Sequence, residues 1–191
     1  IDEACELLSY EVDTQVLAKA QKRLRLAPTT RVLYVRHAHA HQRRSWEGDD
    51  DLRPLDKKGR RQAEMLVPML TPYHPTAIYS ALPQRCQQTA APLADELGMD
   101  IAINKAFGDE VFDANPDVAR AAFQRVVDGG GVPVIVSQGL TIPGIIESYA
   151  PKFITTPIEE LKFKKASVWV LSFNDGELTG ADYLASPLPV R

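Results

Sequence analysis

The sequence predicts an α/β domain with a mainly parallel central sheet flanked by helices. Short apolar runs alternate with helical patterns along the chain, an order typical of βαβ units. Several of these runs are apolar almost throughout, as expected of strands that helices cover on both faces. The chain has 191 residues, of which 45% are hydrophobic and 25% charged, so it is long enough to bury a sizeable core.

The first expected element is an amphipathic helix over residues 2–26. Its apolar residues recur at helical spacing: Leu8, Val12, Val16, Leu17, Ala20 and Leu24. We divide the chain into residues 1–28, an N-terminal helix and linker, and residues 29–191, the main domain. Because the sequence opens at Ile1 in the middle of this pattern, we expect a fragment whose first helix is left from a preceding domain.

The apolar runs that follow are predicted strands. Turn residues bound them, and the last two form an expected hairpin through the Asn-Asp-Gly turn at 174–176. The predicted strands cover residues 31–37, 76–80, 101–104, 132–137, 167–173 and 177–184.

The helices expected between these strands carry terminal signals. Asp56 is a predicted N-cap, Gly98 a C-terminal glycine and Pro116 a first-turn proline. The predicted helices cover residues 57–70, 82–98, 116–127 and 141–150. Two segments, 38–54 and the acidic 107–115, are expected to be loops.

The predicted sheet also places a ligand site. Ligands of parallel sheets bind at the carboxyl ends of the strands. The segments just past three of the apolar strands are 36–38, 80–82 and 137–139. We therefore expect these segments to converge.

Charge and cysteine content exclude several function classes. A formal net charge of −3 provides no overall basic field, so neither nucleic acid nor a membrane surface is an expected partner. The longest apolar stretch is interrupted by Gln138 and Pro143, so no membrane span is expected. Cys5 and Cys86 lie far apart, which favours a reduced, cytoplasmic protein over a disulfide framework.

The run "VRHAHAHQRR" at residues 35–44 permits a metal site as a minority interpretation. His37, His39 and His41 alternate, so an extended chain would point them the same way. The surrounding arginines would repel a cation, and the chain has four histidines in all, the fourth being His74 in a segment without a motif. For His39 and His41, we expect solvated loop positions.

Phosphate chemistry explains Arg36 and His37 of this run better. Arg36 and His37 come at the end of an otherwise apolar strand. A guanidinium matches phosphate oxygens, and an imidazole can attack phosphorus to form a covalent intermediate.

Three segments resemble the histidine phosphatase superfamily, which has a phosphoglycerate mutase-like fold: "VLYVRHAHA", "RPLDKKGRRQAE" and "YSALPQRCQQTAAPLA". The resemblance implies a hydrolase in which His37 becomes phosphohistidine and in which Arg36 and Arg85 hold the phosphoryl group. It places the acid that protonates the leaving oxygen at Glu110, with neighbouring Asp109 as a rival. It implies no metal or other cofactor for this domain.

The sequence departs from the family pattern at Gln138. The family has a histidine in a segment like SHG, and this chain has "SQG". A glutamine amide donates hydrogen bonds but carries no positive charge, a loss of about 1.5–3 kcal/mol in a dry pocket. An alternative is therefore a catalytically weakened domain that binds a phosphate or nucleotide and regulates a neighbour.

Other residues are candidates for contact with substrate. Gln138, Arg44 and Ser80 are expected to bind it, and Trp46 could stack on a base at the pocket mouth. Equally, Trp46 could only pin its loop, and the nearby arginines could pair with the aspartates at 49–51.

The segment "IDEACELLSYEVDTQVLAKA" resembles the closing part of a Nudix domain, although the Nudix box is absent. The whole chain is similar to the second half of two-domain MutT-type proteins of actinobacteria. That resemblance implies hydrolysis of 8-oxo-(d)GTP or diadenosine polyphosphates by the missing Nudix half, which would also hold Mg²⁺. Expected partners are a small phosphorylated substrate, such as a nucleotide, and a Nudix domain of the same or a neighbouring chain.

Overall fold

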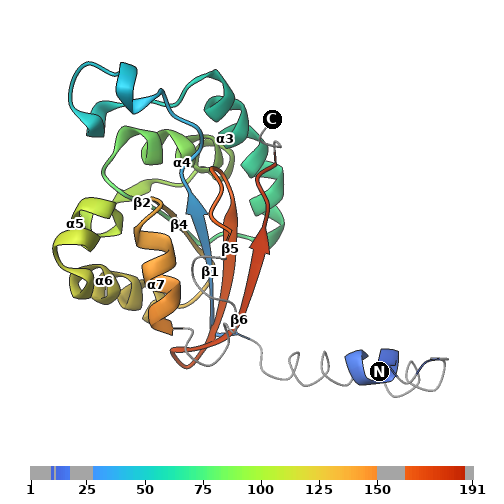
Figure 1. Cartoon of the computed structure of the whole chain (residues 1–191). Coiled ribbons are helices and arrows are strands. Elements are labelled where there is room, and N and C mark those ends of the chain that lie inside the picture. Colours follow the sequence, from blue (N-terminus) through green and yellow to red (C-terminus); the bar gives the residue numbers. More distant parts are fainter. Residues whose placement is uncertain (1–9, 11, 18–27, 150–161, 188–191) are drawn as a thin grey trace.

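The computed structural model describes residues 10, 12–17, 28–149 and 162–187 (Figure 1). Its strands are β1 (Thr30–Arg36), β2 (Ala77–Ser80), β3 (Ile101–Ile103), β4 (Pro133–Ser137), β5 (Val168–Asn174) and β6 (Glu177–Leu184). Its helices are α3 (Lys57–Leu70), α4 (Gln84–Leu97), α5 (Asp109–Ala114), α6 (Pro116–Asp128) and α7 (Thr141–Tyr149). Figure 1 shows α5, α6 and α7 grouped beside the sheet, with α3 and α4 grouped apart from them.

The sheet confirms the predicted α/β class and is mixed in direction. Its strand order is β3-β2-β4-β1-β5-β6; the first four strands are parallel to one another, and β5 runs antiparallel to both of its neighbours, β1 and β6. Arg36 lies opposite Ser137 in the β1–β4 pair, and Ser80 lies opposite Val136 in the β2–β4 pair. The carboxyl ends of β1, β2 and β4 therefore meet at one edge, as predicted.

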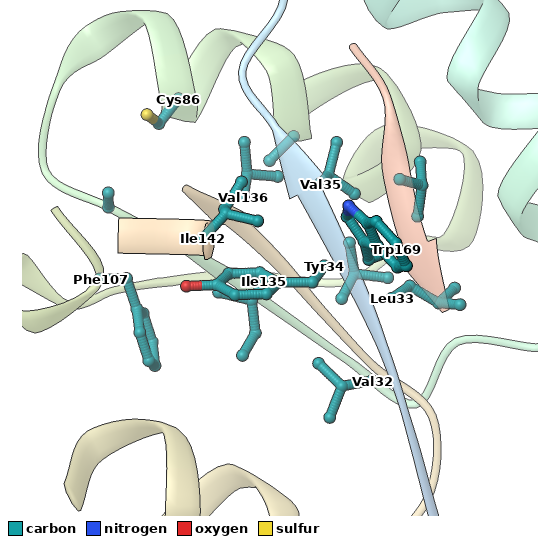
Figure 2. Close-up of a cluster of buried hydrophobic side chains, with 14 of the residues drawn as sticks. Val32, Leu33, Tyr34, Val35, Cys86, Phe107, Ile135, Val136, Ile142 and Trp169 are labelled. Carbon is teal, nitrogen blue, oxygen red and sulfur yellow. The ribbon is translucent and has the colours of Figure 1, made fainter. Parts of the chain in front are cut away.

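Strand β1 runs through the centre of the core. Leu33, Tyr34 and Val35 have no exposed surface, which accounts for the near-continuous apolar run. The Tyr34 ring packs against Phe123 of α6 with 5.2 Å between centroids. On the neighbouring strand β5, Trp169 lies opposite Tyr34, and Figure 2 shows both residues. This buried strand fixes the position of the polar residues that follow it.

The predicted terminal signals are confirmed. The Asp56 side chain accepts a hydrogen bond of 2.8 Å from the Gly59 amide at the start of α3. Gly98 ends α4 with φ of 61°, and Pro116 is the first residue of α6. The hairpin turn places Asp175 and Gly176 at φ of 49° and 79°.

The prediction of a loop over residues 107–115 is wrong. A 3₁₀ turn covers Lys105–Phe107, and α5 follows from Asp109 to Ala114. Two carboxylates in the first turn of α5 favour its N-terminus electrostatically, but six residues are too few for helical periodicity to be recognised.

Most of the expected helix over residues 2–26 lies outside the described residues. Within it, residues 12–17 are helical, and Val12 and Val16 are 68% and 60% exposed. In the part of the chain that the structure describes, no helix is long and apolar enough to cross a membrane.

Candidate functional site

His37 lies directly after β1 and is 3% exposed. Its Nδ1 is 2.8 Å from the Ala38 carbonyl oxygen. Because a carbonyl only accepts hydrogen bonds, Nδ1 carries the proton and Nε2 carries the lone pair. Burial, together with the charges of Lys165, Arg85 and Arg36, holds the pKa of His37 well below its ordinary value. The imidazole is therefore neutral, with a nucleophilic nitrogen at Nε2.

Lys165 faces that nitrogen and was not singled out from the sequence. Its Nζ lies 2.7 Å from His37 Nε2, although the two residues are 128 positions apart. Lys165 lies three residues before the start of β5, which pairs antiparallel with β1, so it lies beyond the carboxyl end of β1. That register is the signal that could have found it, but the sequence alone did not specify which strand β5 joins.

Arg85 projects from α4 and is 2% exposed. Its Nη1 donates a 2.6 Å hydrogen bond to the Asp50 carbonyl oxygen, and its Nη2 lies 3.1 Å from the Asp50 carboxylate. The same carboxylate also pairs with Arg43 at 2.9 Å and Arg53 at 2.8 Å. Burial raises the pKa of Asp50, but the hydrogen bonds from Arg43 and Arg53 and the charge of Arg85 outweigh it and lower the pKa overall.

Both predicted phosphate arginines keep an unused donor. Arg36 Nη1 donates to the Phe163 carbonyl oxygen. The Nε atoms of Arg36 and Arg85 are buried and have no hydrogen-bond partner among the described residues. Buried polar atoms are normally satisfied, so two such donors beside a neutral imidazole fit an oxyanion.

Gln138 lies at the end of β4 and is 6% exposed. Its Oε1 accepts a 2.9 Å hydrogen bond from the Asp109 amide, which fixes the orientation of the side-chain amide because only the oxygen can accept. The Nε2 donor is left without a hydrogen-bond partner among the described residues. The next residue is Gly139. A Cβ at this position would lie only 2.7 Å from Arg36 Nη2, so the glycine leaves room for the guanidinium group.

The two rival carboxylates have different surroundings. Asp109 Oδ1 accepts hydrogen bonds of 2.9 Å from the Leu140 amide, the Thr141 amide and the Thr141 hydroxyl, and so holds the start of α7. The Glu110 side chain is exposed and forms no hydrogen bond with the described residues. The two acids therefore differ in that hydrogen bonds to the start of α7 hold only Asp109 in place.

A cavity of about 470 Å³ adjoins this cluster. The predicted site residues Arg85, Glu110 and Gln138 line it, as does the rival acid Asp109, whereas Arg36 and His37 are not among its lining residues. Carboxylates dominate its wall: Asp49, Asp50, Asp51, Asp109, Glu110 and Asp113, against the two cations Arg43 and Arg85. The mouth is therefore acidic even though its floor carries arginine.

Two predicted substrate contacts lie away from the cavity. The Ser80 hydroxyl is buried and donates to the Ala81 carbonyl oxygen at 2.9 Å. Arg44 is exposed, and its Nε donates to Gln42. Arg43 lines the cavity instead, and Trp46 Nε1 donates to the Asp49 carbonyl oxygen, which pins the loop.

The histidines of the opening run diverge. His39 pairs with the helix-capping carboxylate of Asp56, and the His41 ring lies 6.3 Å from that of Trp46. Over the described ranges, no group of three or more His, Cys, Asp or Glu residues is arranged to hold a metal ion.

Comparison with known proteins agrees with this site. Residues 32–113 match the histidine phosphatase superfamily (branch 1). An 8-oxo-(d)GTP phosphatase of Mycolicibacterium smegmatis is 42% identical over 187 residues, which make up 98% of this chain. The chain spans 57% of the length of that relative.

Solved structures share the fold. They include the protein histidine phosphatase SixA complexed with tungstate (TM-score 0.65, 15% identity, covering 82% of this chain and 95% of that one). A mycobacterial glucosyl-3-phosphoglycerate phosphatase in complex with inorganic phosphate has a TM-score of 0.58 at 19% identity, over 75% of this chain and 89% of that one. The match over residues 32–113 includes Arg36, His37 and Arg85, and the solved structures share the fold, so this part of the chain resembles the histidine phosphatase superfamily and supports a hydrolase.

Proposed function

We propose that this domain hydrolyses a phosphate ester through a phosphohistidine formed on His37. The observation that carries the proposal is the pair of buried Nε donors of Arg36 and Arg85, unpartnered among the described residues, beside a neutral imidazole. A phosphoryl group between them would satisfy both donors and spread its charge over preorganised cations. Gln138 Nε2 supplies a third donor.

The proposed reaction has two steps. His37 Nε2 attacks phosphorus, the ester P–O bond breaks, and Glu110 gives a proton to the leaving oxygen. Water then attacks phosphorus as Glu110 takes its proton, and the N–P bond electrons return to Nε2. Asp109, which accepts three hydrogen bonds from Leu140 and Thr141, positions Gln138 through its backbone amide.

For the substrate, we propose a nucleotide or another small phosphoester. The 8-oxo-(d)GTP phosphatase named above supports a nucleotide. The acidic mouth opposes polyanions, because like charges repel in a partly desolvated cavity. We therefore expect a terminal monophosphate to be preferred over a free triphosphate.

We further propose that residues 1–28 belong to a preceding Nudix domain, with residues 29–191 as the phosphatase domain. The exposed Val12 and Val16 support a partner for this helix, as does the greater length of the relative. Oxidised-nucleotide hydrolysis, and any Mg²⁺, would belong to that Nudix half.

A panel assay tests the proposed reaction. We expect release of inorganic phosphate from at least one of a set of nucleoside mono-, di- and triphosphates, sugar phosphates and p-nitrophenyl phosphate, measured in EDTA. No release from any member, either in EDTA or without it, would refute hydrolysis by this domain. Release that occurs without EDTA and is abolished by it would favour the metal-dependent alternative.

A second candidate function, a weakened phosphate-binding regulatory domain, rests on Gln138. If glutamine is a defect, Gln138→His should raise kcat about 10- to 100-fold, the equivalent of one charge-assisted hydrogen bond. We expect instead no gain, because the Oε1 contact with the Asp109 amide would be lost. A tenfold gain would establish the regulatory interpretation.

A further inference from the structure

The turn that contains Lys165 is hydrogen-bonded to the backbone of Arg36 and His37. The Ser167 amide donates to the Lys164 carbonyl oxygen at 3.0 Å, which closes the turn. The Ala166 amide donates to the carbonyl oxygens of both Arg36 and His37, at 3.1 and 3.3 Å. The turn therefore has a fixed position relative to the imidazole.

The turn is held in this position although one of its residues, Ala166, has an unfavourable backbone conformation. Ala166 has φ of 59° and no exposed surface. A non-glycine residue in the left-handed region costs free energy, and such strain persists where the surroundings impose it, often at functional sites. Here the strained residue is the one that directs Lys165 toward Nε2.

Cations surround the amine of Lys165. Burial, the guanidinium groups of Arg36 and Arg85, and the more distant Arg53 lower its pKa to about 7, while the Cys86 thiol opposes them. Asp50 already pairs with Arg85, but no carboxylate among the described residues pairs with Arg36 or Lys165, and a phosphoryl group would relieve the remaining like-charge repulsion.

We propose that Lys165 is a catalytic residue whose ammonium moves from His37 Nε2 to a phosphoryl oxygen, and so supplies the positive charge that Gln138 lacks. This inference rests on the proposed function. Before substrate binds, the ammonium occupies the lone pair and shields the nucleophile, which agrees with the 3% exposure of His37.

The step conserves atoms and charge. As phosphate enters, the N–H···Nε2 hydrogen bond is replaced by an N–H···O hydrogen bond, and Lys165 keeps its proton. The freed lone pair forms the N–P bond while the ester P–O bond breaks toward the leaving oxygen, which Glu110 protonates.

Three variants test the role of Lys165. Lys165→Met should lower the rate of His37 phosphorylation at least about 10-fold, the effect of one lost charge-assisted hydrogen bond. Lys165→Arg should restore part of that loss. Lys164→Met is the matched control: this neighbouring lysine is exposed, so wild-type rates are expected.

The pH profile adds a readout that a structural role would not move. Since the ammonium is lost as pH rises through the pKa of about 7, kcat/KM of the wild type should fall above it. With Lys165→Arg the same substrate should show no such fall, because a guanidinium stays charged. Bound phosphate stabilises the ammonium, so the fall in kcat should come at higher pH.

The outcomes separate this inference from the proposed function. Wild-type phosphorylation rates in folded Lys165→Met, verified by circular dichroism, would overturn the role of Lys165 alone. If the wild type forms no phosphohistidine, the proposed function fails, and calorimetry with tungstate still tests the contact. Binding at least tenfold weaker in Lys165→Met would support the ammonium–oxyanion contact; equal binding would refute it.

Discussion

Replacing His37 with alanine is expected to abolish the covalent intermediate and to lower the rate of hydrolysis by at least about 10³-fold. His37 is the proposed nucleophile, and its imidazole is neutral with the lone pair on Nε2. The measurement is transfer of ³²P from a labelled phosphoester to the protein. In the wild type the label should be lost in acid and kept in alkali, as expected of a phosphoramidate bond.

His41→Ala provides the control from the same histidine run. Its ring is exposed beside Trp46, so labelling and turnover should remain at wild-type levels. If His41→Ala abolished activity together with His37→Ala, a shared metal site would explain the result better than phosphohistidine. Label that persists in His37→Ala would place the nucleophile elsewhere.

Gly59→Ala is expected to destabilise the fold by about 3 kcal/mol, the upper range for overpacking. A Cβ at Gly59 would lie 1.8 Å from the backbone carbonyl oxygen of His39 and 2.7 Å from its carbon. Neither atom belongs to a flexible side chain, so α3 must move away from the loop that follows β1. Helix propensity alone predicts the opposite sign, because alanine is favoured over glycine by about 1 kcal/mol.

Thermal unfolding provides the measurement, with an expected fall in Tm of about 6–12 °C for a chain of this size. Gly180→Ala in β6 is the matched control, because its Cβ would meet only the Ser172 Cβ at an ordinary 3.8 Å. The control should be as stable as the wild type. Equal or higher Tm for Gly59→Ala would show that the contact relaxes at no cost.

The elements with strong local signals were predictable from sequence. The buried run of β1, the Asp56 cap and the Gly98 terminus each arise from interactions within a few residues, which leave a pattern in the chain. The direction of β5 was harder to predict from the sequence. It pairs antiparallel with β1 because of tertiary packing, which leaves no local sequence pattern. Helix α5 was missed because it is short.

The same division applies to the site. The convergence of residues 36–38 and 137–139 followed from the sheet alone. Arg43 at the cavity in place of Arg44, and the identity of Asp50 as the partner of Arg85, depend on the course of an irregular loop. Lys165 has no motif, since its contact with His37 spans 128 positions and depends on a strained turn.

Asp50 gives the site an internal competitor. Because its carboxylate and carbonyl oxygen already hold Arg85, an incoming anion exchanges one ion pair for another instead of desolvating a bare guanidinium. The net free energy of binding is the difference between the Arg85–anion pair and the Arg85–Asp50 pair. Only an anion that interacts with the site more strongly than the Asp50 carboxylate does can therefore bind. Chloride and monocarboxylates offer Arg85 no more than Asp50 does, whereas in the proposed site a tetrahedral dianion would also engage Arg36. In that site, the loop that closes over the arginine would select for phosphate.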